Sequence, residues 1–300
     1  MNLVLLWIPA TIAASLLQTA RNLTQRSLTD AIGVVGATQV RFLYGLPFAL
    51  VFLAVICLVG GRAPPMADGR TLLFVLWGSV TQIAATGLML AAMRERSFAV
   101  TTAYTKTEPV QVAIFGALLL GDALSPLKFA AIAVATAGVV VMSWRSGDRA
   151  GAAGLRPAVL GIAAGACFAL SAVGFRAAIL AFPDGDFLIR ATSALTLGLA
   201  CSTAILVCYM LAADRGALLA SLANWRRSLA AGFLGAAASQ CWFIGFALTS
   251  AANVRTLGLL EVPLAQIASR RIFAEGTSGR EIVGMAMIVG GVGALLALTV

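Results

Sequence analysis

The feature that most constrains this chain is its succession of long apolar runs, separated by short polar or Gly/Pro-containing breaks. A membrane-spanning helix needs about 20 mostly apolar residues, and ten runs approach or exceed that length. They cover residues 3–20, 32–59, 71–93, 97–120, 127–144, 158–181, 187–212, 228–249, 253–272 and 281–299. Only 11% of the residues are charged, against about 25% in soluble domains. The sequence therefore predicts an all-α integral membrane protein with about ten transmembrane helices.

The charge pattern argues against a nucleic-acid partner, and the composition argues against enzymatic chemistry. The net charge is +9, but the basic residues are dispersed in short breaks, which is typical of topology determinants and not of a nucleic-acid surface. The chain has no histidine and five cysteines, all inside apolar runs, so we expect no metal site and no cofactor. Neither a nucleophile–base pair nor a Walker loop is present, so we expect neither an enzyme nor an ATP-driven pump.

The two halves of the chain repeat. A shift of 153 residues superposes four pairs in order: Glu108 on Glu261, Asp122 on Glu275, Ser125 on Ser278 and Gly138 on Gly291. Because each half would contain five helices, the second half would enter the bilayer from the opposite side. We therefore predict inverted repeats at 1–146 and 158–300, joined by a linker at 147–157, around a central cavity suited to alternating access.

Several short motifs fall in matching order in both halves. The first half carries Trp7, Arg41-Phe42, Pro109, Gly121-Asp122 and Ala137-Gly138, and the second carries Arg190, Pro263, Glu275 and Gly290-Gly291. In this order and duplication the chain resembles the EamA-like branch of the drug/metabolite transporter superfamily. The resemblance implies a ten-helix bundle with a central cavity that exports amino acids or other small metabolites.

The predicted location is a bacterial-type inner (plasma) membrane, in contact with the lipid bilayer. The breaks after odd-numbered runs hold most of the basic residues: Arg21, Arg26, Arg94, Arg96, Arg145, Arg149, Arg156, Arg215, Arg226, Arg227, Arg270, Arg271 and Arg280. The positive-inside rule places these breaks in the cytoplasm and both termini outside. Members of the EamA-like group usually keep both termini in the cytoplasm, so two orientations stay open.

Two carboxylates near the middle of apolar runs are the first candidates for the site. Glu108 and Glu261 occupy equivalent repeat positions, and ionisable residues at this depth need a functional or pairing role. On an unbroken helix Tyr104, Glu108 and Gln111 share one face, which predicts a polar stripe that contacts substrate. A carboxylate there could bind an ammonium group or exchange a proton.

The alternative is that these glutamates pair with buried bases and fix helix packing. The possible partners are Lys106, Arg41, Arg176, Arg190 and Arg255. Arg41 is either an interface anchor or a ligand-binding residue. Gln82, Gln240, Trp77 and Trp242 could line the cavity or pack between helices, and Gly161, Gly165, Gly284 and Gly291 are interpreted as close-packing positions.

Taken together, the pattern favours a secondary transporter, an exporter of a small metabolite such as an amino acid. The alternatives are a proton-coupled multidrug exporter of lipophilic cations and, from another class, a non-transporting scaffold or a lipid-acting enzyme. The predicted partners are a small-molecule substrate and the bilayer, with protons as a further candidate and no nucleic acid. Since the duplication supplies both halves in one chain, a monomer is expected.

Overall fold

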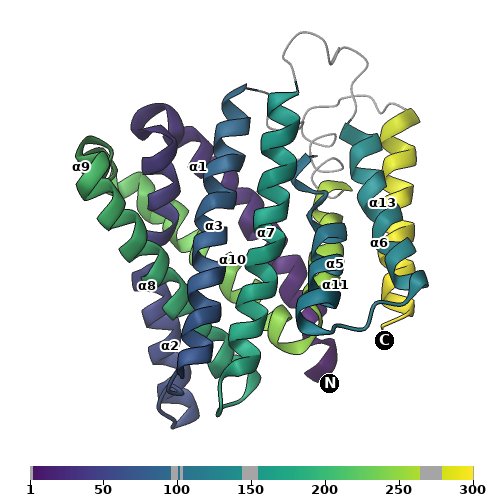
Figure 1. Ribbon diagram of the computed structural model, residues 1–300, viewed down its shortest axis with the longest axis horizontal. Coiled ribbons are helices and arrows are strands. Elements are labelled where there is room, and N and C mark those ends of the chain that lie inside the picture. Colours follow the sequence, from purple (N-terminus) through teal and green to yellow (C-terminus); the bar gives the residue numbers. More distant parts are fainter. Residues whose placement is uncertain (1–2, 96–100, 102–103, 144–154, 264–278, 300) are drawn as a thin grey trace.

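The computed structural model describes residues 3–95, 101, 104–143, 155–263 and 279–299, and in these residues it contains helices and no strand. The principal helices form one bundle and run along a common direction (Figure 1). In chain order they are α1 (Trp7–Leu43), α2 (Leu46–Gly60), α3 (Gly69–Glu95), α5 (Glu108–Leu120), α6 (Pro126–Ser143), α7 (Arg156–Ala181), α8 (Phe187–Ala213), α9 (Arg215–Ala223), α10 (Trp225–Leu248), α11 (Ala251–Leu257) and α13 (Gly279–Ala297).

The predicted class, an all-helical membrane protein, is confirmed. Six stretches are long and apolar enough to span a membrane, and two shorter apolar helices accompany them. The six are Ile32–Gly60, Gly69–Glu95, Arg156–Ala181, Phe187–Ala213, Trp225–Leu248 and Gly279–Ala297. Large apolar side chains such as Leu58 and Leu118 are exposed on the surface, as a lipid-facing surface requires. The count of ten spans stays a prediction.

The first predicted span does not end at residue 20. The polar stretch that follows continues the same helix, and α1 reverses only at Gly33, whose φ of 72° is open to glycine but strained for other residues. α1 therefore consists of two helices joined by a tight reversal (Figure 1). Arg21 lies on the first of them and is 1% exposed, so its assignment to a loop is wrong.

Two prolines inside the apolar runs, Pro47 and Pro109, stand where a helix restarts. Pro47 occupies the first turn of α2, directly after a turn at residues 44–45. Pro109 occupies the first turn of α5, directly after a turn at Lys106 and Thr107. In the first turn the missing N–H of proline costs no hydrogen bond, so each proline fixes an interruption of the helix at low cost.

The bundle is built from helix pairs that are distant in sequence. α3 packs along α7, α1 along α10, and α6 along α13. In the predicted repeat, α3 corresponds to α10, α7 to α1 and α6 to α13. The pair of α3 and α7 is therefore equivalent to the pair of α10 and α1, and the pair of α6 and α13 is equivalent to itself. The division into two repeats nevertheless stays a prediction, and Glu275, Ser278 and residues 147–154 of the linker lie outside the described part of the chain.

Glycines bring α6 and α13 into backbone contact. A Cβ atom on Gly138 would lie 2.7 Å from the Gly284 carbonyl oxygen, and one on Gly291 would lie 2.7 Å from the Ala131 carbonyl oxygen. On α7 a Cβ at Gly161 would lie 2.5 Å from the Tyr104 Cβ. The interpretation as close-packing positions is confirmed for Gly161, Gly165 and Gly291, where an added Cβ would lie 3.0 Å or less from a neighbouring atom. The Gly284 backbone forms the contact surface for Gly138.

Candidate functional site

Two ion pairs cross between the α5 region and the α11 region. The Glu108 carboxylate lies 3.0 Å from Nε of Arg255, and the Lys106 ammonium contacts the Glu261 carboxylate. Glu108 and Glu261 are both buried. In this structure each glutamate is therefore paired with a buried base. In each pair the two charges come from different halves of the chain.

Both glutamates begin a helical segment directly after an interruption. The turn at Lys106 and Thr107 ends before Glu108, and the 3₁₀ turn Gly258–Leu260 ends before Glu261. These are the positions that the repeat of 153 residues makes equivalent. A turn or a short 3₁₀ segment inside a helix changes the backbone hydrogen bonding locally, and such segments often mark functional hinges.

The predicted stripe of Tyr104, Glu108 and Gln111 is not formed. It assumed an unbroken helix, whereas the turn at Lys106 and Thr107 changes the direction of the side chains that precede it. Tyr104 packs on Gly161 of α7, and the Gln111 side chain lies near Gly165 of the same helix. Glu108 instead faces Arg255 of α11.

The two candidate tryptophans have opposite environments. Trp242 of α10 is buried, donates a hydrogen bond from Nε1 to Gln18 Oε1 at 3.0 Å, and carries the Arg255 guanidinium 4.3 Å from its ring centroid. A cation over an indole ring is stabilised by the ring quadrupole, so Trp242 is part of the charged cluster. Trp77 of α3 is 43% exposed on the outside of the bundle and does not reach that cluster.

Arg41 projects into a second polar cluster between α1 and α3. It is 4% exposed and donates to the Thr86 hydroxyl at 3.1 Å. With the Gln82 amide turned so that its oxygen faces Arg41, that oxygen accepts from both terminal guanidinium nitrogens, and the amide nitrogen donates to Ser171 at 2.5 Å. Gln82 thereby links α1 to α7, and every partner of Arg41 in the described residues is neutral.

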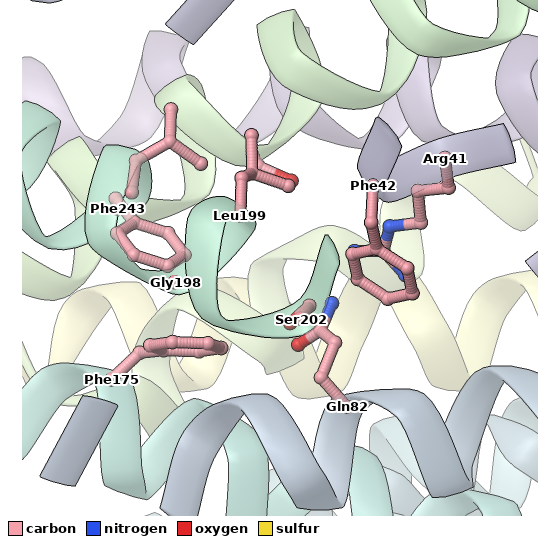
Figure 2. A pocket seen from close by; sticks show the side chains of 10 residues that line it. Arg41, Phe42, Gln82, Phe175, Gly198, Leu199, Ser202 and Phe243 are labelled. Atoms are coloured by element: carbon pink, nitrogen blue, oxygen red, sulfur yellow. The ribbon is translucent and has the colours of Figure 1, made fainter. Parts of the chain in front are cut away.

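A small cavity opens beside Arg41 and Gln82. Figure 2 shows Arg41 and Phe42 on one side, Phe175 and Phe243 on the other, and Gln82 and Ser202 between them. Its water-accessible volume is about 10 Å³, which is room for about one water molecule. In this conformation the cavity beside Arg41 is therefore nearly filled by its own lining.

Two further candidate side chains, Gln240 and Arg176, have structural partners. Gln240 donates to the Thr192 hydroxyl at 2.8 Å, which joins α10 to α8. Arg176 forms an ion pair with Asp122 at 3.1 Å and donates to the carbonyl oxygens of Phe246 and Thr249 at 2.9 and 2.5 Å. Within the described ranges there is no group of three or more His, Cys, Asp or Glu side chains that could hold a metal ion.

Comparison with known proteins agrees with this architecture. Residues 5–144 match the model of the EamA-like transporter family. A solved structure titled only as the crystal structure of a protein superposes with a TM-score of 0.70 over 99% of both chains at 18% identity. At that identity the likeness shows a shared fold. No curated protein sequence matches the chain significantly.

These observations describe a multi-pass helical membrane protein, and the match over residues 5–144 suggests a membrane transporter of the drug/metabolite type. The family match confirms the resemblance to the EamA-like transporters and supports membership of the drug/metabolite transporter superfamily.

Proposed function

We propose that the protein is a secondary transporter that exports a small metabolite by alternating access of two five-helix repeats, as a monomer in a bacterial-type inner membrane. The observation that carries this proposal is the pair of interrupted helices, each with a glutamate directly after the interruption and each paired with a base from the other half. Paired charges at such positions can separate when the halves move, provided that entering water or a substrate charge replaces the lost partner.

The ion pairs are suited to hold one state of a moving interface. Each joins groups whose exposed fraction is between 8 and 12%, and an ion pair at that burial is costly to break unless another charge or water replaces it. Glu261 also accepts a hydrogen bond from the Thr19 hydroxyl at 3.1 Å. Separation of the α5 and α11 regions would release Lys106, Glu108, Arg255 and Glu261 together.

The lipophilic-cation alternative has less support. It needs a carboxylate free to take a cation or a proton, whereas both buried glutamates of the described residues are already paired with bases. The proposed substrates are small metabolites, and amino acids are among them.

Counterflow in proteoliposomes tests the proposal. Vesicles preloaded with an unlabelled compound should accumulate the labelled form transiently, and Glu108→Gln should abolish that accumulation because Arg255 loses its counter-charge. Arg156→Gln is the matched control, since Arg156 pairs with Glu95 at 3.3 Å but is 78% exposed. Lack of counterflow by the wild-type protein across neutral, anionic and cationic metabolites would refute transport. An imposed pH gradient shows in the same vesicles whether protons are coupled.

A further inference from the structure

The buried charges of the bundle are not electrically balanced. The charged cluster around Glu108 and Glu261 and the polar cluster around Arg41 together contain two carboxylates, Glu108 and Glu261, and four buried or nearly buried bases: Arg21, Arg41, Lys106 and Arg255. Lys106 and Arg255 are neutralised by the glutamates. Glu261 lies within electrostatic range of Arg21, but its two oxygens are taken by Lys106 and Thr19. Two positive charges therefore remain inside the bundle.

The fold brings these two arginines together. Because α1 reverses at Gly33, Arg21 lies on its first limb and Arg41 on its second. Both side chains pack on the same residue of α10: a Cβ on Gly235 would lie 3.3 Å from Cδ of Arg21 and 3.4 Å from Cγ of Arg41. Glycine at 235 makes room for both, and the resulting repulsion between like charges needs a compensating anion.

Neutral groups alone satisfy these guanidinium groups in the described residues. Arg21 donates to the Asn22 amide oxygen at 2.5 and 3.2 Å, and Arg41 donates to Thr86 and Gln82. Nη1 of Arg21 and Nε of Arg41 have no hydrogen-bond partner there. An ionised side chain in a membrane interior is costly. An anion that enters the bundle would therefore stabilise the charged forms of Arg21 and Arg41.

The cavity beside Arg41 has the lining that an organic anion requires. Nε of Arg41 and the hydroxyl of Ser202, which is 1% exposed, are unpartnered buried groups at its wall. Arginine presents planar donors that match a carboxylate. Gln82 and Ser239 add polar groups to the lining, and Gly198 is part of it. The larger part of the wall is apolar and comes from Phe42, Phe175, Leu195, Leu199 and Phe243, which suits a hydrocarbon group (Figure 2).

We propose that the substrate is a small organic anion. Its carboxylate binds Arg41 and the Ser202 hydroxyl and is attracted by the nearby charge of Arg21, while its apolar part packs among the phenylalanines. This inference rests on the proposed transport function and names the substrate class of its site. An amino acid is disfavoured relative to the acid without the amino group, because its ammonium would add to the excess of positive charge left by Arg21 and Arg41. Since the cavity holds about one water in this conformation, binding requires the helices around it to separate.

Three ligands that share the same branched five-carbon group and differ in their charged groups test the proposal on the purified wild-type protein in detergent. At pH 7.5, 4-methylpentanoate is an anion, leucine a zwitterion and 3-methylbutylamine a cation. A ligand that binds only the folded protein raises its thermal stability with concentration, so titration gives each affinity. We expect the anion to bind at least about tenfold more tightly than leucine, as one charge-assisted contact provides, and the amine not to bind. Equal or tighter binding of leucine or the amine would overturn the proposal.

Variants assign the anion to its residues. Arg41→Gln should abolish the stabilisation by 4-methylpentanoate, and Ser202→Ala, which removes one hydroxyl and keeps both arginines, should weaken it about tenfold. Arg156→Gln is the control and should bind as the wild type does. If Arg41→Gln does not fold, the comparison of the three ligands on the wild-type protein and the affinity of Ser202→Ala still test the proposal. Undiminished binding by Ser202→Ala and Arg41→Gln would place the anion elsewhere and refute the site.

The outcomes separate this inference from the proposed function. Counterflow of leucine or the amine without anion selectivity would retain the transporter and refute the anion site. Selective binding of 4-methylpentanoate without counterflow of any compound would retain the site and refute transport.

Discussion

The two halves of the chain meet along two very different contacts. Between α6 and α13 the contact is made by glycines, with backbone against backbone and no charge. Between the α5 and α11 regions it is made by Lys106, Glu108, Arg255 and Glu261. Both contacts join helices that the predicted repeat makes equivalent, so their difference is one of chemistry and not of position in the fold.

The chemistry of each contact fits a different mechanical role. Backbone contacts at glycine depend on a shape match that is lost by small displacements, which favours a permanent join. When an ion pair separates, water or another charge can stabilise each of its two groups. An ion-paired contact is therefore suited to opening. We therefore expect α6 and α13 to stay together while the α5 and α11 regions separate.

Charge reversal in the opening contact should have the largest effect. Lys106→Glu or Glu261→Lys alone places like charges face to face at a buried site, and loss of a buried pair costs about 3–5 kcal/mol of unfolding free energy. The double variant restores an attractive pair and should recover much of the stability. Thermal unfolding and counterflow of the three variants measure this. Single variants as stable as the wild type would show that the pair is absent in the membrane.

Addition of one methyl group to the permanent contact should have the next largest effect. Gly291→Ala puts a Cβ 2.7 Å from backbone atoms of Ala131 and Ala135, and overpacking of this kind costs about 1–3 kcal/mol. Gly290→Ala on the same helix is the control, because a Cβ there meets nothing within 4 Å. Transport per folded molecule should be unchanged in both. Equal thermal stability of the two variants would contradict the packing argument.

A smaller effect is expected where the aromatic ring supports the charged contact. Trp242→Phe keeps a ring beneath Arg255 but removes the donor to Gln18, a loss of about 1 kcal/mol. Trp242→Leu also removes the ring and should lose about 0.5–2 kcal/mol more. Unfolding midpoints of the two variants give the difference. If they coincide, the cation–ring contact contributes nothing.

The smallest effect is expected outside both contacts, at the start of α3. Asp68 accepts a hydrogen bond from the Thr71 backbone N–H at 2.7 Å, which lowers the pKa of this exposed carboxyl. A carboxyl whose folded pKa is lowered stabilises the fold above its unfolded pKa, about 3.9, and loses that contribution as pH falls through the folded value. Asp68→Ala should therefore lower the thermal stability slightly at pH 7 and not at pH 3. A larger loss at pH 3 would reverse this sign.

The sequence predicted the helical membrane fold well because long apolar runs define it almost alone. Glu108 and Glu261 also stood out, since charge inside an apolar run is conspicuous and the repeat made them equivalent. Their partners could not be chosen from several bases, because the pairs join residues about 150 positions apart and depend on how the helices face one another.

The failures have local physical causes. Arg21 was assigned to a loop because the apolar run ends before it, yet the polar residues that follow continue the helix as far as Gly33. The signal that could have found it is the absence of glycine and proline between Arg21 and Gly33. The Tyr104 stripe failed because hydrophobic pattern does not reveal a turn two residues before a proline. Trp77 lies inside a run, but position in a run does not say whether a side chain faces lipid or the bundle.

The first and last described residues lie at the same end of the bundle (Figure 1). A reporter that fluoresces only when it folds in the cytoplasm would thus give one answer from either end, bright at both or dark at both. Bright signals would support the orientation usual among EamA-like proteins, and dark signals the one that the basic residues predict. Fragments of a split fluorescent protein fused to the two ends would meet on one side of the membrane and could close the chain into a ring.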